Sequence, residues 1–260
     1  MKIEYFLSDK LRQNFNEWQK FNLEIRQLLT RPGIKRVLEV GGGANPLLSL
    51  DEIRRCRLEY AVLDISATEL AKAPEGYTKI QADIADPTLS LGGTFDLIFS
   101  RFLAEHVPSG HDFHTNVFNL LREGGYAFHA FPTLYTTPFL INLLLPDDLT
   151  ERIILMCQPW RTKVGKEGKF RVYYDWCYGP TTTNMKKLTS LGYDIEEYTG
   201  FFGHRYYSKT SILAVLNLLE RLKADLLIRF PLPLLTQYAH ILLRRHSLLQ
   251  EQPASDAALI

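Results

Sequence analysis

The chain has 260 residues, 46% of them hydrophobic and 23% charged, a composition typical of one generous globular domain. Its formal net charge is only +1, so no overall basic field would attract nucleic acid or an anionic membrane. Three cysteines, an odd number at spacings that match no zinc site, argue against a disulfide framework and predict a reduced, cytoplasmic setting.

The beginning of the chain predicts a helical layer over residues 1–31. Apolar side chains recur at helical spacing between residues 5 and 30, and Thr30-Arg31-Pro32-Gly33 then breaks the pattern. No apolar signal segment is present at the N-terminus. The apolar run at 139–145 is far shorter than the roughly 20 residues that a spanning helix needs, so we expect no membrane span.

Strands and helices alternate in the next hundred residues. Short apolar strands separated by helices predict a parallel sheet covered on both faces. The last helix of this series is expected to stop at Gly124-Gly125. The predicted strands are 35–40, 59–63, 78–81, 95–99 and 126–131, and the predicted helices are 46–56, 67–72 and 111–122.

The alternation is interrupted after Pro132. Residues 133–180 are aromatic and irregular, and we interpret them as a substrate-lid insertion within a domain that spans residues 32–247. An apolar helix at 211–228 could contact a membrane or a dimer partner, although a helix buried on the sheet explains it more simply. Other predicted elements are helices near 147–156 and at 181–191, strands at 193–199 and 237–243, and a flexible tail at 248–260.

The segment Val37–Pro46 carries the most information about function. A strand that ends in Glu39 runs into three glycines and then into Asn45-Pro46, which should open a helix. Such a turn can bind the anionic end of a ligand through unpaired backbone N–H groups. A dinucleotide fingerprint on Gly41 and Gly43 would need a third glycine where Pro46 stands, which disfavours an NAD-dependent oxidoreductase.

Acidic residues follow three successive strands, at Glu39, Asp64 and Asp83. The carboxyl ends of parallel strands share one edge of a sheet, where open α/β folds bind ligands. Asp64 can accept hydrogen bonds from a ribose diol, with Ile65 packed on an adenine and Asp83 accepting from its amino group. For Asp64 alone, a helix N-cap is the simpler alternative.

The segments 37–46, 60–66, 81–84, 94–100 and 121–130 resemble, in order and spacing, the motifs of class I S-adenosylmethionine-dependent methyltransferases. The resemblance covers about residues 33–132. It implies an α/β, Rossmann-like, seven-stranded and mostly parallel sheet with helices on both faces, an antiparallel last strand, and S-adenosylmethionine as cofactor. The family's third loop glycine is replaced here by Asn45, which tolerates left-handed backbone. The implied cofactor contacts are Glu39, Gly41, Gly43, Asn45, Asp64, Ile65, Asp83, Ile84 and Ser100.

Histidines near the predicted methyl-transfer site are the candidate bases. His106, in a Glu-His pair after the fourth strand, is the first choice, and a purely structural histidine is the alternative. His204 is the second choice. We predict no metal, because further ligands near the Glu-His pair are not evident. The candidate acceptor-binding residues are Arg101, Tyr135, Tyr173, Tyr174 and Trp176, although aromatic packing of an insertion explains the rings equally well.

The resemblance and the aromatic insertion predict methyl transfer to a small, partly apolar metabolite, on oxygen rather than nitrogen or carbon. The alternatives are a protein or nucleic-acid methyltransferase and a non-catalytic scaffold of the same fold. Amino-methylating enzymes of DNA and RNA carry Asn/Asp-Pro-Pro-aromatic where this chain has Ser100-Arg101-Phe102-Leu103. As partners we expect a small-molecule acceptor and no nucleic acid, and a homodimer is possible.

Overall fold

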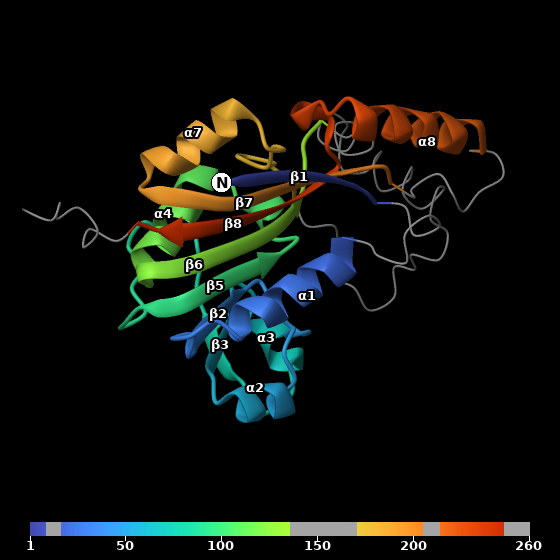
Figure 1. The fold of residues 1–260 in the computed structure, drawn as a ribbon. Coiled ribbons are helices and arrows are strands. Elements are labelled where there is room, and N and C mark those ends of the chain that lie inside the picture. Colours follow the sequence, from blue (N-terminus) through green and yellow to red (C-terminus); the bar gives the residue numbers. More distant parts are fainter. Residues whose placement is uncertain (9–16, 136–170, 205–213, 247–260) are drawn as a thin grey trace, which may run out of the picture.

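A computed structural model describes residues 1–8, 17–135, 171–204 and 214–246, which build one eight-stranded sheet with helices on both faces (Figure 1). The strand order is β1-β7-β8-β6-β5-β2-β3-β4, and only β8 runs antiparallel to its neighbours β6 and β7. The strands are β1 (Lys2–Leu7), β2 (Arg36–Val40), β3 (Glu59–Asp64), β4 (Thr78–Gln81), β5 (Phe95–Arg101), β6 (Leu121–Pro132), β7 (Tyr193–Phe202) and β8 (Tyr238–Arg245).

Helices and 3-10 turns connect these strands. The α-helices are α1 (Glu17–Leu29), α2 (Leu50–Cys56), α3 (Ala67–Lys72), α4 (Gly110–Leu120), α7 (Thr182–Ser190) and α8 (Ala214–Arg229). The 3-10 turns are η1 (Ala104–His106) and η3 (Pro233–Leu235). The predicted helix near 147–156, most of the predicted lid and the tail at 248–260 lie outside the described residues.

The Rossmann-like, mostly parallel sheet with an antiparallel last strand is confirmed, but the sheet has eight strands instead of seven. Residues 2–7, expected to belong partly to a helical layer, form the edge strand β1 parallel to β7, with Lys2 opposite Glu197 and Leu7 opposite Phe202. Figure 1 shows β1 lying beside β7 although the two are far apart in the sequence. The helix of the N-terminal layer begins at Glu17 as α1.

Two hydrophobic layers hold the helices on the sheet. On one face, α1 buries Phe21 and Ile25 against strand residues such as Leu97. On the other face, α4 and α7 pack on Leu38 and Ile98 and their neighbours. Successive strand residues point to opposite faces, so the parity of a residue in its strand decides which layer its side chain joins.

Helix α4 ends earlier than predicted, at Leu120, and β6 starts at Leu121. Gly124 does adopt left-handed backbone, with φ of 70°. It lies inside β6, where the register against β5 shifts between Phe95 and Leu97. The glycine therefore serves an irregularity of the strand and does not terminate the helix.

Helix α8 contradicts the prediction of a helix buried on the sheet. Its buried residues are only Glu220, Ala224 and Leu227. Leucines of the same helix are exposed, among them Leu218 and Leu222, each 57% exposed. None of the helices in the described part of the chain combines the length and apolar character needed to cross a bilayer.

Candidate active site

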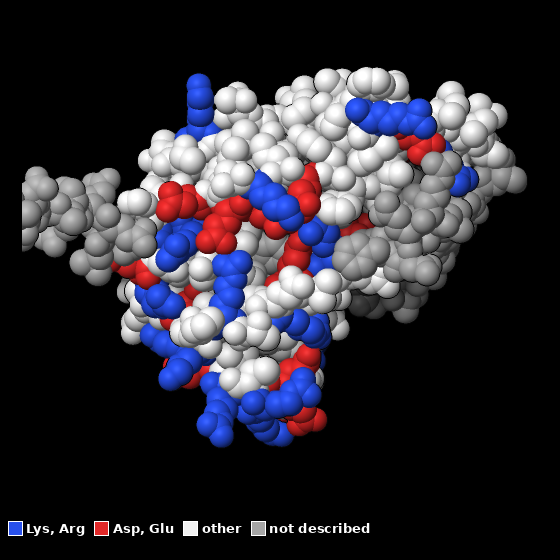
Figure 2. All heavy atoms as spheres, in the orientation of Figure 1, with Lys and Arg blue, Asp and Glu red and all other residues white. Residues whose placement is uncertain are grey.

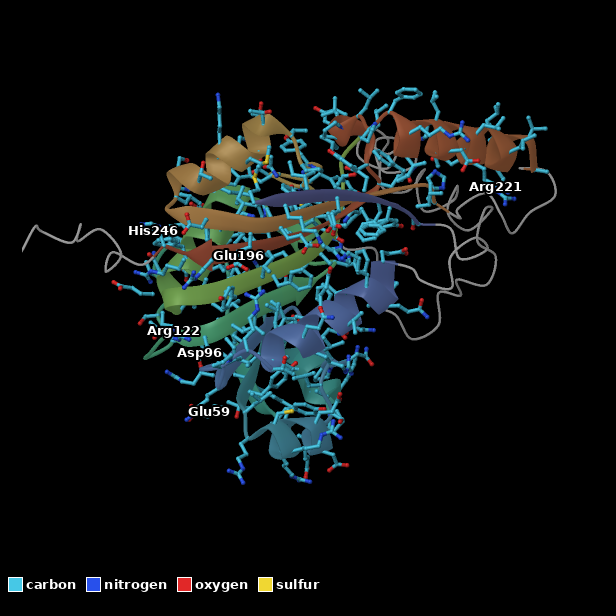
Figure 3. All side chains as sticks on the ribbon, in the orientation of Figure 1. Glu59, Asp96, Arg122, Glu196, Arg221 and His246 are labelled. Atoms are coloured by element: carbon cyan, nitrogen blue, oxygen red, sulfur yellow. The ribbon has the colours of Figure 1, made fainter. Side chains whose placement is uncertain are left out.

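The carboxyl ends of β2, β3, β4 and β5 bring most of the predicted site residues to one edge of the sheet. Ion pairs lie at the opposite edge, among them the pair of Arg122 with Asp96, both labelled in Figure 3. There Asp96 accepts hydrogen bonds from the amides of Lys35 and Arg36, both at 2.7 Å, and from the Arg122 guanidinium. These contacts join strands at the edge opposite the predicted site residues.

The glycine loop turns tightly at the end of β2. Gly41 has φ of 75°, and its amide donates to the carbonyl of Leu63 at 2.7 Å. A Cβ at Gly41 would lie 2.8 Å from Cδ1 of Leu103, so the backbone there approaches its neighbour as only glycine permits. Gly43 also has positive φ, but Asn45 does not. The replacement of the family's third glycine by Asn45 therefore requires no left-handed asparagine.

The predicted helix over 46–56 begins four residues late. Ser49 caps α2, its hydroxyl accepting from the amide of Glu52 at 3.2 Å while the Glu52 carboxylate accepts from the amide of Ser49 at 3.0 Å. This capping box fixes the helix start beyond Pro46. The glycine loop at 41–43, and not the N-terminus of α2, therefore directly follows β2 at this edge.

Glu39 lies beneath the loop, 1% exposed. Its carboxylate accepts hydrogen bonds from the amide of Leu47 at 2.8 Å and from the hydroxyl of Tyr60, and Arg101 Nη2 lies 3.1 Å from it. Burial raises the pKa of Glu39, and the Arg101 charge and the two hydrogen bonds oppose that shift. Glu39 thus organises the loop, and Arg101, expected at the acceptor, is engaged with it.

Asp64 stands half-buried at the end of β3, next to the loop. A Cβ on Gly43 would lie 3.0 Å from Asp64 Oδ2, and Oδ1 accepts from the amide of Ser66 at 2.9 Å. Burial raises the pKa of Asp64, while the amide of Ser66 acts in the opposite direction. The N-cap of α3 is Ser66, not Asp64. Ile65, 64% exposed, offers an apolar surface beside this carboxylate.

The third strand end contributes an exposed acid. Asp83 Oδ1 accepts from the amide of Ala85 at 2.8 Å, and the neighbouring Ile84 points into the core at 4% exposure. Asn116 of α4 fixes this loop by donating from Nδ2 to the carbonyls of Ile84 and Asp86, both at 2.7 Å. The sequence did not single out Asn116, and a polar residue on the apolar face of a helix was the available signal.

Ser100 faces away from the glycine loop. It is fully buried, and its hydroxyl lies 2.8 Å from Nδ1 of His129. The rings of His129 and His114 form a T-shaped pair with their centroids 5.5 Å apart. Burial lowers the pKa of His114 to about 3, so this cluster is neutral. The Ser100 hydroxyl is thus engaged with His129, and the contact of Ser100 with the cofactor stays a prediction.

Phe102 connects β5 to η1 with left-handed backbone, φ 49°. Such a conformation is uncommon for a bulky residue and costs roughly 1–2 kcal/mol. Its ring packs 4.9 Å from that of Trp18 and 5.9 Å from that of Tyr238. Strained residues gather at functional sites. Phe102 lies at the end of β5, four residues before His106.

His106 is half-buried on η1. Its Nδ1 lies 2.8 Å from the carbonyl of Arg171, so Nδ1 carries the proton and Nε2 is the basic nitrogen. Burial lowers the pKa of His106, with the Arg171 carbonyl opposing the shift, which keeps the ring neutral at pH 7. Its predicted partner Glu105 is 4% exposed, and burial raises the pKa of Glu105 to about 8. The two side chains, 3.8 Å apart, are therefore both neutral.

The aromatic segment at 171–178 lies against η1. The amides of Tyr173 and Tyr174 donate to the Glu105 carbonyl at 2.7 and 3.2 Å. Tyr135 and Tyr173 keep exposed surface, whereas Tyr174 is 2% exposed and belongs to the core. Trp176 stacks on His114 at 5.8 Å. The structure thus brings Tyr173 next to Glu105 and His106, stacks Tyr135 on Tyr178 at 6.1 Å, and assigns packing contacts to Tyr174 and Trp176.

His204, the second candidate base, has its contacts elsewhere. It is 6% exposed, and its Nε2 lies 3.7 Å from Oε1 of Glu220 on α8. Burial lowers the pKa of His204 to about 4. These contacts place it in the attachment of α8 to the sheet. In the described ranges, no group of three His, Cys, Asp or Glu side chains could hold a metal ion.

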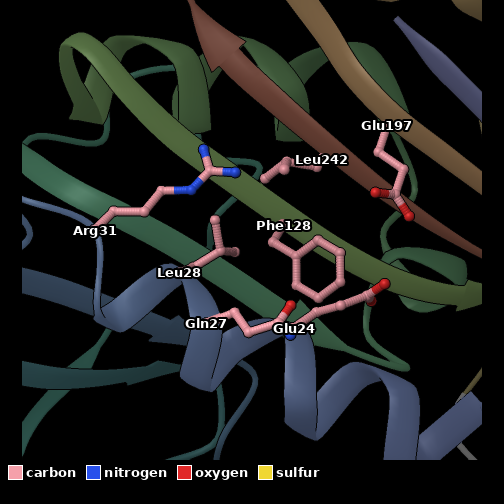
Figure 4. Close-up of a pocket in the computed structure, with 7 residues that line it drawn as sticks. All are labelled: Glu24, Gln27, Leu28, Arg31, Phe128, Glu197 and Leu242. Atoms are coloured by element: carbon pink, nitrogen blue, oxygen red, sulfur yellow. The ribbon is translucent and has the colours of Figure 1, made fainter.

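A small cavity of about 80 Å³ lies between α1 and the sheet, lined by residues that include Glu24, Arg31, Phe128 and Glu197 (Figure 4). Sites for drug-sized ligands are roughly 300–1,000 Å³. The cavity is too small for a nucleoside cofactor and is built from other elements than the glycine loop. It is therefore separate from the candidate active site.

A family model described as a methyltransferase domain matches residues 6–175, and no curated protein matches the chain. The fold is similar to a S-adenosylmethionine-dependent methyltransferase of Archaeoglobus fulgidus (15% identity, 88% of this chain and 95% of that one, TM-score 0.51). It is also similar to one of Clostridium acetobutylicum (13%, 92% and 96%, TM-score 0.52). A third similar structure is Haemonchus contortus phosphoethanolamine N-methyltransferase 2 in complex with S-adenosyl-L-methionine (15%, 88% and 53%, TM-score 0.52).

Proposed function

Because the chain belongs to the methyltransferase-domain family, we propose that it uses S-adenosylmethionine to methylate a small, partly apolar metabolite on oxygen. The observation that carries this proposal is the meeting of Gly43, Asp64 and the exposed Ile65 at one sheet edge. Those three features match an anionic group, a ribose diol and an adenine. Family membership sets aside the dinucleotide-dependent oxidoreductase and the non-catalytic scaffold.

The residues at the edge fit the cofactor by their donors and acceptors. The loop amides at Gly41–Gly43 are suited to a carboxylate, since glycines admit close approach. The half-buried Asp64 carboxylate can accept from two ribose hydroxyls, and the exposed Asp83 can accept from an adenine amino group. S-adenosylmethionine, when bound, supplies an electrophilic methyl group on a positively charged sulfur.

His106 is the proposed general base. A hydroxyl acceptor must lose its proton as the new carbon–oxygen bond forms, and a neutral imidazole is suited to receive it. The hydrogen bond from Nδ1 to the Arg171 carbonyl orients the ring and leaves Nε2 as the nitrogen that takes the proton. Glu105, held protonated by burial, does not compete for it.

Tyr135 and Tyr173 are the proposed contacts of the acceptor. Both keep exposed surface, Tyr173 beside η1 and Tyr135 beside Tyr178 in the same aromatic segment, and so can cover the apolar part of a small molecule while excluding water. Alignment of the acceptor with the methyl group accounts for much of the rate in such a displacement. Arg101 acts on the acceptor indirectly, through the loop that it supports.

Two measurements test the proposal. Calorimetric titration with S-adenosylmethionine should show binding, and absence of binding at millimolar concentration would sink it. Incubation with methyl-labelled cofactor and a metabolite extract of the source organism should label a small molecule, and the chemical shift of the labelled methyl group in NMR should place it on oxygen and not on nitrogen. Label found only on protein or nucleic acid would contradict the small-molecule acceptor.

A further inference from the structure

Helix α8 turns an apolar stripe outward. Six of its side chains, Val215, Leu216, Leu218, Leu219, Leu222 and Leu226, are between 46% and 69% exposed. The segment after the helix continues the stripe, with Phe230, Leu232 and Leu234 between 45% and 70% exposed. In Figure 2 the region over α8 is largely white, with a few charged atoms. Apolar patches of this extent on a soluble surface mark an interaction site.

The contacts of the inward face of α8 prevent the helix from rotating about its axis to bury its leucines. Glu220 is 7% exposed, and its carboxylate accepts from Nε2 of Gln237 and lies 2.7 Å from Nζ of Lys223. His204 Nε2 lies 3.7 Å from the same carboxylate. Ala224 and Leu227 pack beside this polar cluster on Phe202. Rolling the helix would break the buried hydrogen bond from Gln237 to Glu220 and leave that carboxylate without its partner outside the helix, so this contact fixes the outward direction of the stripe.

The charges that flank the stripe are mainly positive. Arg221 is half-exposed and Arg229 is exposed, whereas Lys223 is engaged with the inward Glu220 at 2.7 Å and Asp225 is the only acidic side chain of α8 that is not buried. An apolar stripe with basic margins is the pattern of a helix that lies in the interface of an anionic bilayer. A two-fold dimer through the same stripe would bring these basic margins against each other.

We propose that α8 and residues 230–234 dock on the surface of an anionic lipid bilayer. The helix would lie along the surface with its leucines among the acyl chains and its basic side chains at the headgroups. Helix α8 lies between the carboxyl end of β7 and the start of β8 (Figure 1), which is the sheet edge that also carries the glycine loop. Docking would therefore hold the candidate active site near the membrane, whatever the acceptor is.

The test is co-sedimentation of the full chain with phosphatidylcholine vesicles, with and without phosphatidylserine. The wild type should sediment with the anionic vesicles. The triple variant Leu218→Gln/Leu222→Gln/Leu226→Gln should bind them at least about tenfold more weakly, because the apolar area that enters the bilayer is lost. Arg229→Gln should weaken binding to the anionic vesicles alone, by about fivefold.

A matched control lies on α1. Leu23 is 48% exposed on another helix, so Leu23→Gln makes the same chemical change and should leave vesicle binding intact. Thermal melting by circular dichroism checks folding, and the single variant Leu222→Gln replaces the triple one if the latter is unfolded. Failure of the wild type to bind anionic vesicles, or equal binding by wild type and Leu222→Gln, overturns the proposal. A dimer in ultracentrifugation that the stripe variants dissociate, without vesicle binding, assigns the stripe to a second copy and also overturns it.

Discussion

The guanidinium of Arg101 lies 3.1 Å from the buried carboxylate of Glu39 and donates a second hydrogen bond, of 2.9 Å, to the carbonyl of Asn45. Arg101, at the end of β5, thereby contacts both Glu39, which comes before the glycine loop, and Asn45, which comes after it. This contact links the neighbouring strands β2 and β5 at the edge of the sheet where the glycine loop lies. Its contribution to the free energy of unfolding can be measured.

Arg101→Met should destabilise the fold by roughly 3–5 kcal/mol, because it leaves the Glu39 carboxylate buried without its cation. Urea denaturation checks this. Arg54→Met is the control, since Arg54 pairs with Asp51 on the exposed surface of α2 and should contribute less than about 1 kcal/mol. Equal stabilities of the Arg101 variant and the wild type would show that Glu39 does not need the pair.

Asp64→Ala should weaken S-adenosylmethionine binding by about 1–3 kcal/mol, the value of hydrogen bonds from hydroxyls to a charged group. Calorimetry measures the change. Asp51→Ala removes a similar carboxylate from the exposed start of α2 and should leave the dissociation constant unchanged. An Asp64 variant with normal affinity would move the ribose away from the end of β3.

His106→Ala should slow turnover about 10²–10⁴-fold while leaving cofactor affinity unchanged, as expected for loss of a general base. His111→Ala, on the exposed first turn of α4, is the control. Because burial lowers the pKa of His106 and the neutral ring is active, the wild-type rate should rise with pH to a plateau, with the midpoint of the rise below the usual pH 6.5 of a histidine. Near-normal turnover of the variant would leave orientation alone as the source of the rate.

Glu105 should make stability depend on pH. Its pKa is raised by burial from 4.5 to about 8, so between these values the folded state keeps a proton that the unfolded state releases. The free energy of unfolding then falls as pH rises through this range, by roughly 3–5 kcal/mol at most, and levels off above pH 8. Glu105→Gln should flatten that fall, and the exposed Glu75→Gln should not. Parallel curves for all three proteins would mean that Glu105 ionises freely.

The local sequence pattern predicted the strands whose carboxyl ends carry the candidate site. The apolar runs at 35–40 and 59–63 correspond to β2 and β3, and their parallel pairing puts Glu39 and Asp64 at one edge. The parity of Ser100 was not predictable, because β5 is buried on both faces and its sequence carries no alternation. Left-handed backbone at Tyr174 and Trp176, with φ of 54° and 59°, depends on contacts made by the whole segment.

Two further features depended on distant contacts. Residues 2–7 form the strand β1 because they pair with the free edge of β7, and the sequence of residues 2–7 does not indicate that partner. The sequence of 211–228 predicted an apolar helix, and the interpretation that it is buried on the sheet was wrong, because most of its leucines face outward. That direction is set by Glu220, whose partners Gln237 and His204 lie outside the helix.

The pairing of β1 with β7 also constrains how the chain folds during synthesis. Residues 2–7 leave the ribosome before the rest of this domain, yet their hydrogen-bonding partners at 197–202 emerge only after most of the domain has been made. Closing so long a loop is entropically slow. Residues 2–7 therefore stay unpaired during that interval, in which chaperones or unwanted strand partners can reach them before the native sheet edge is completed.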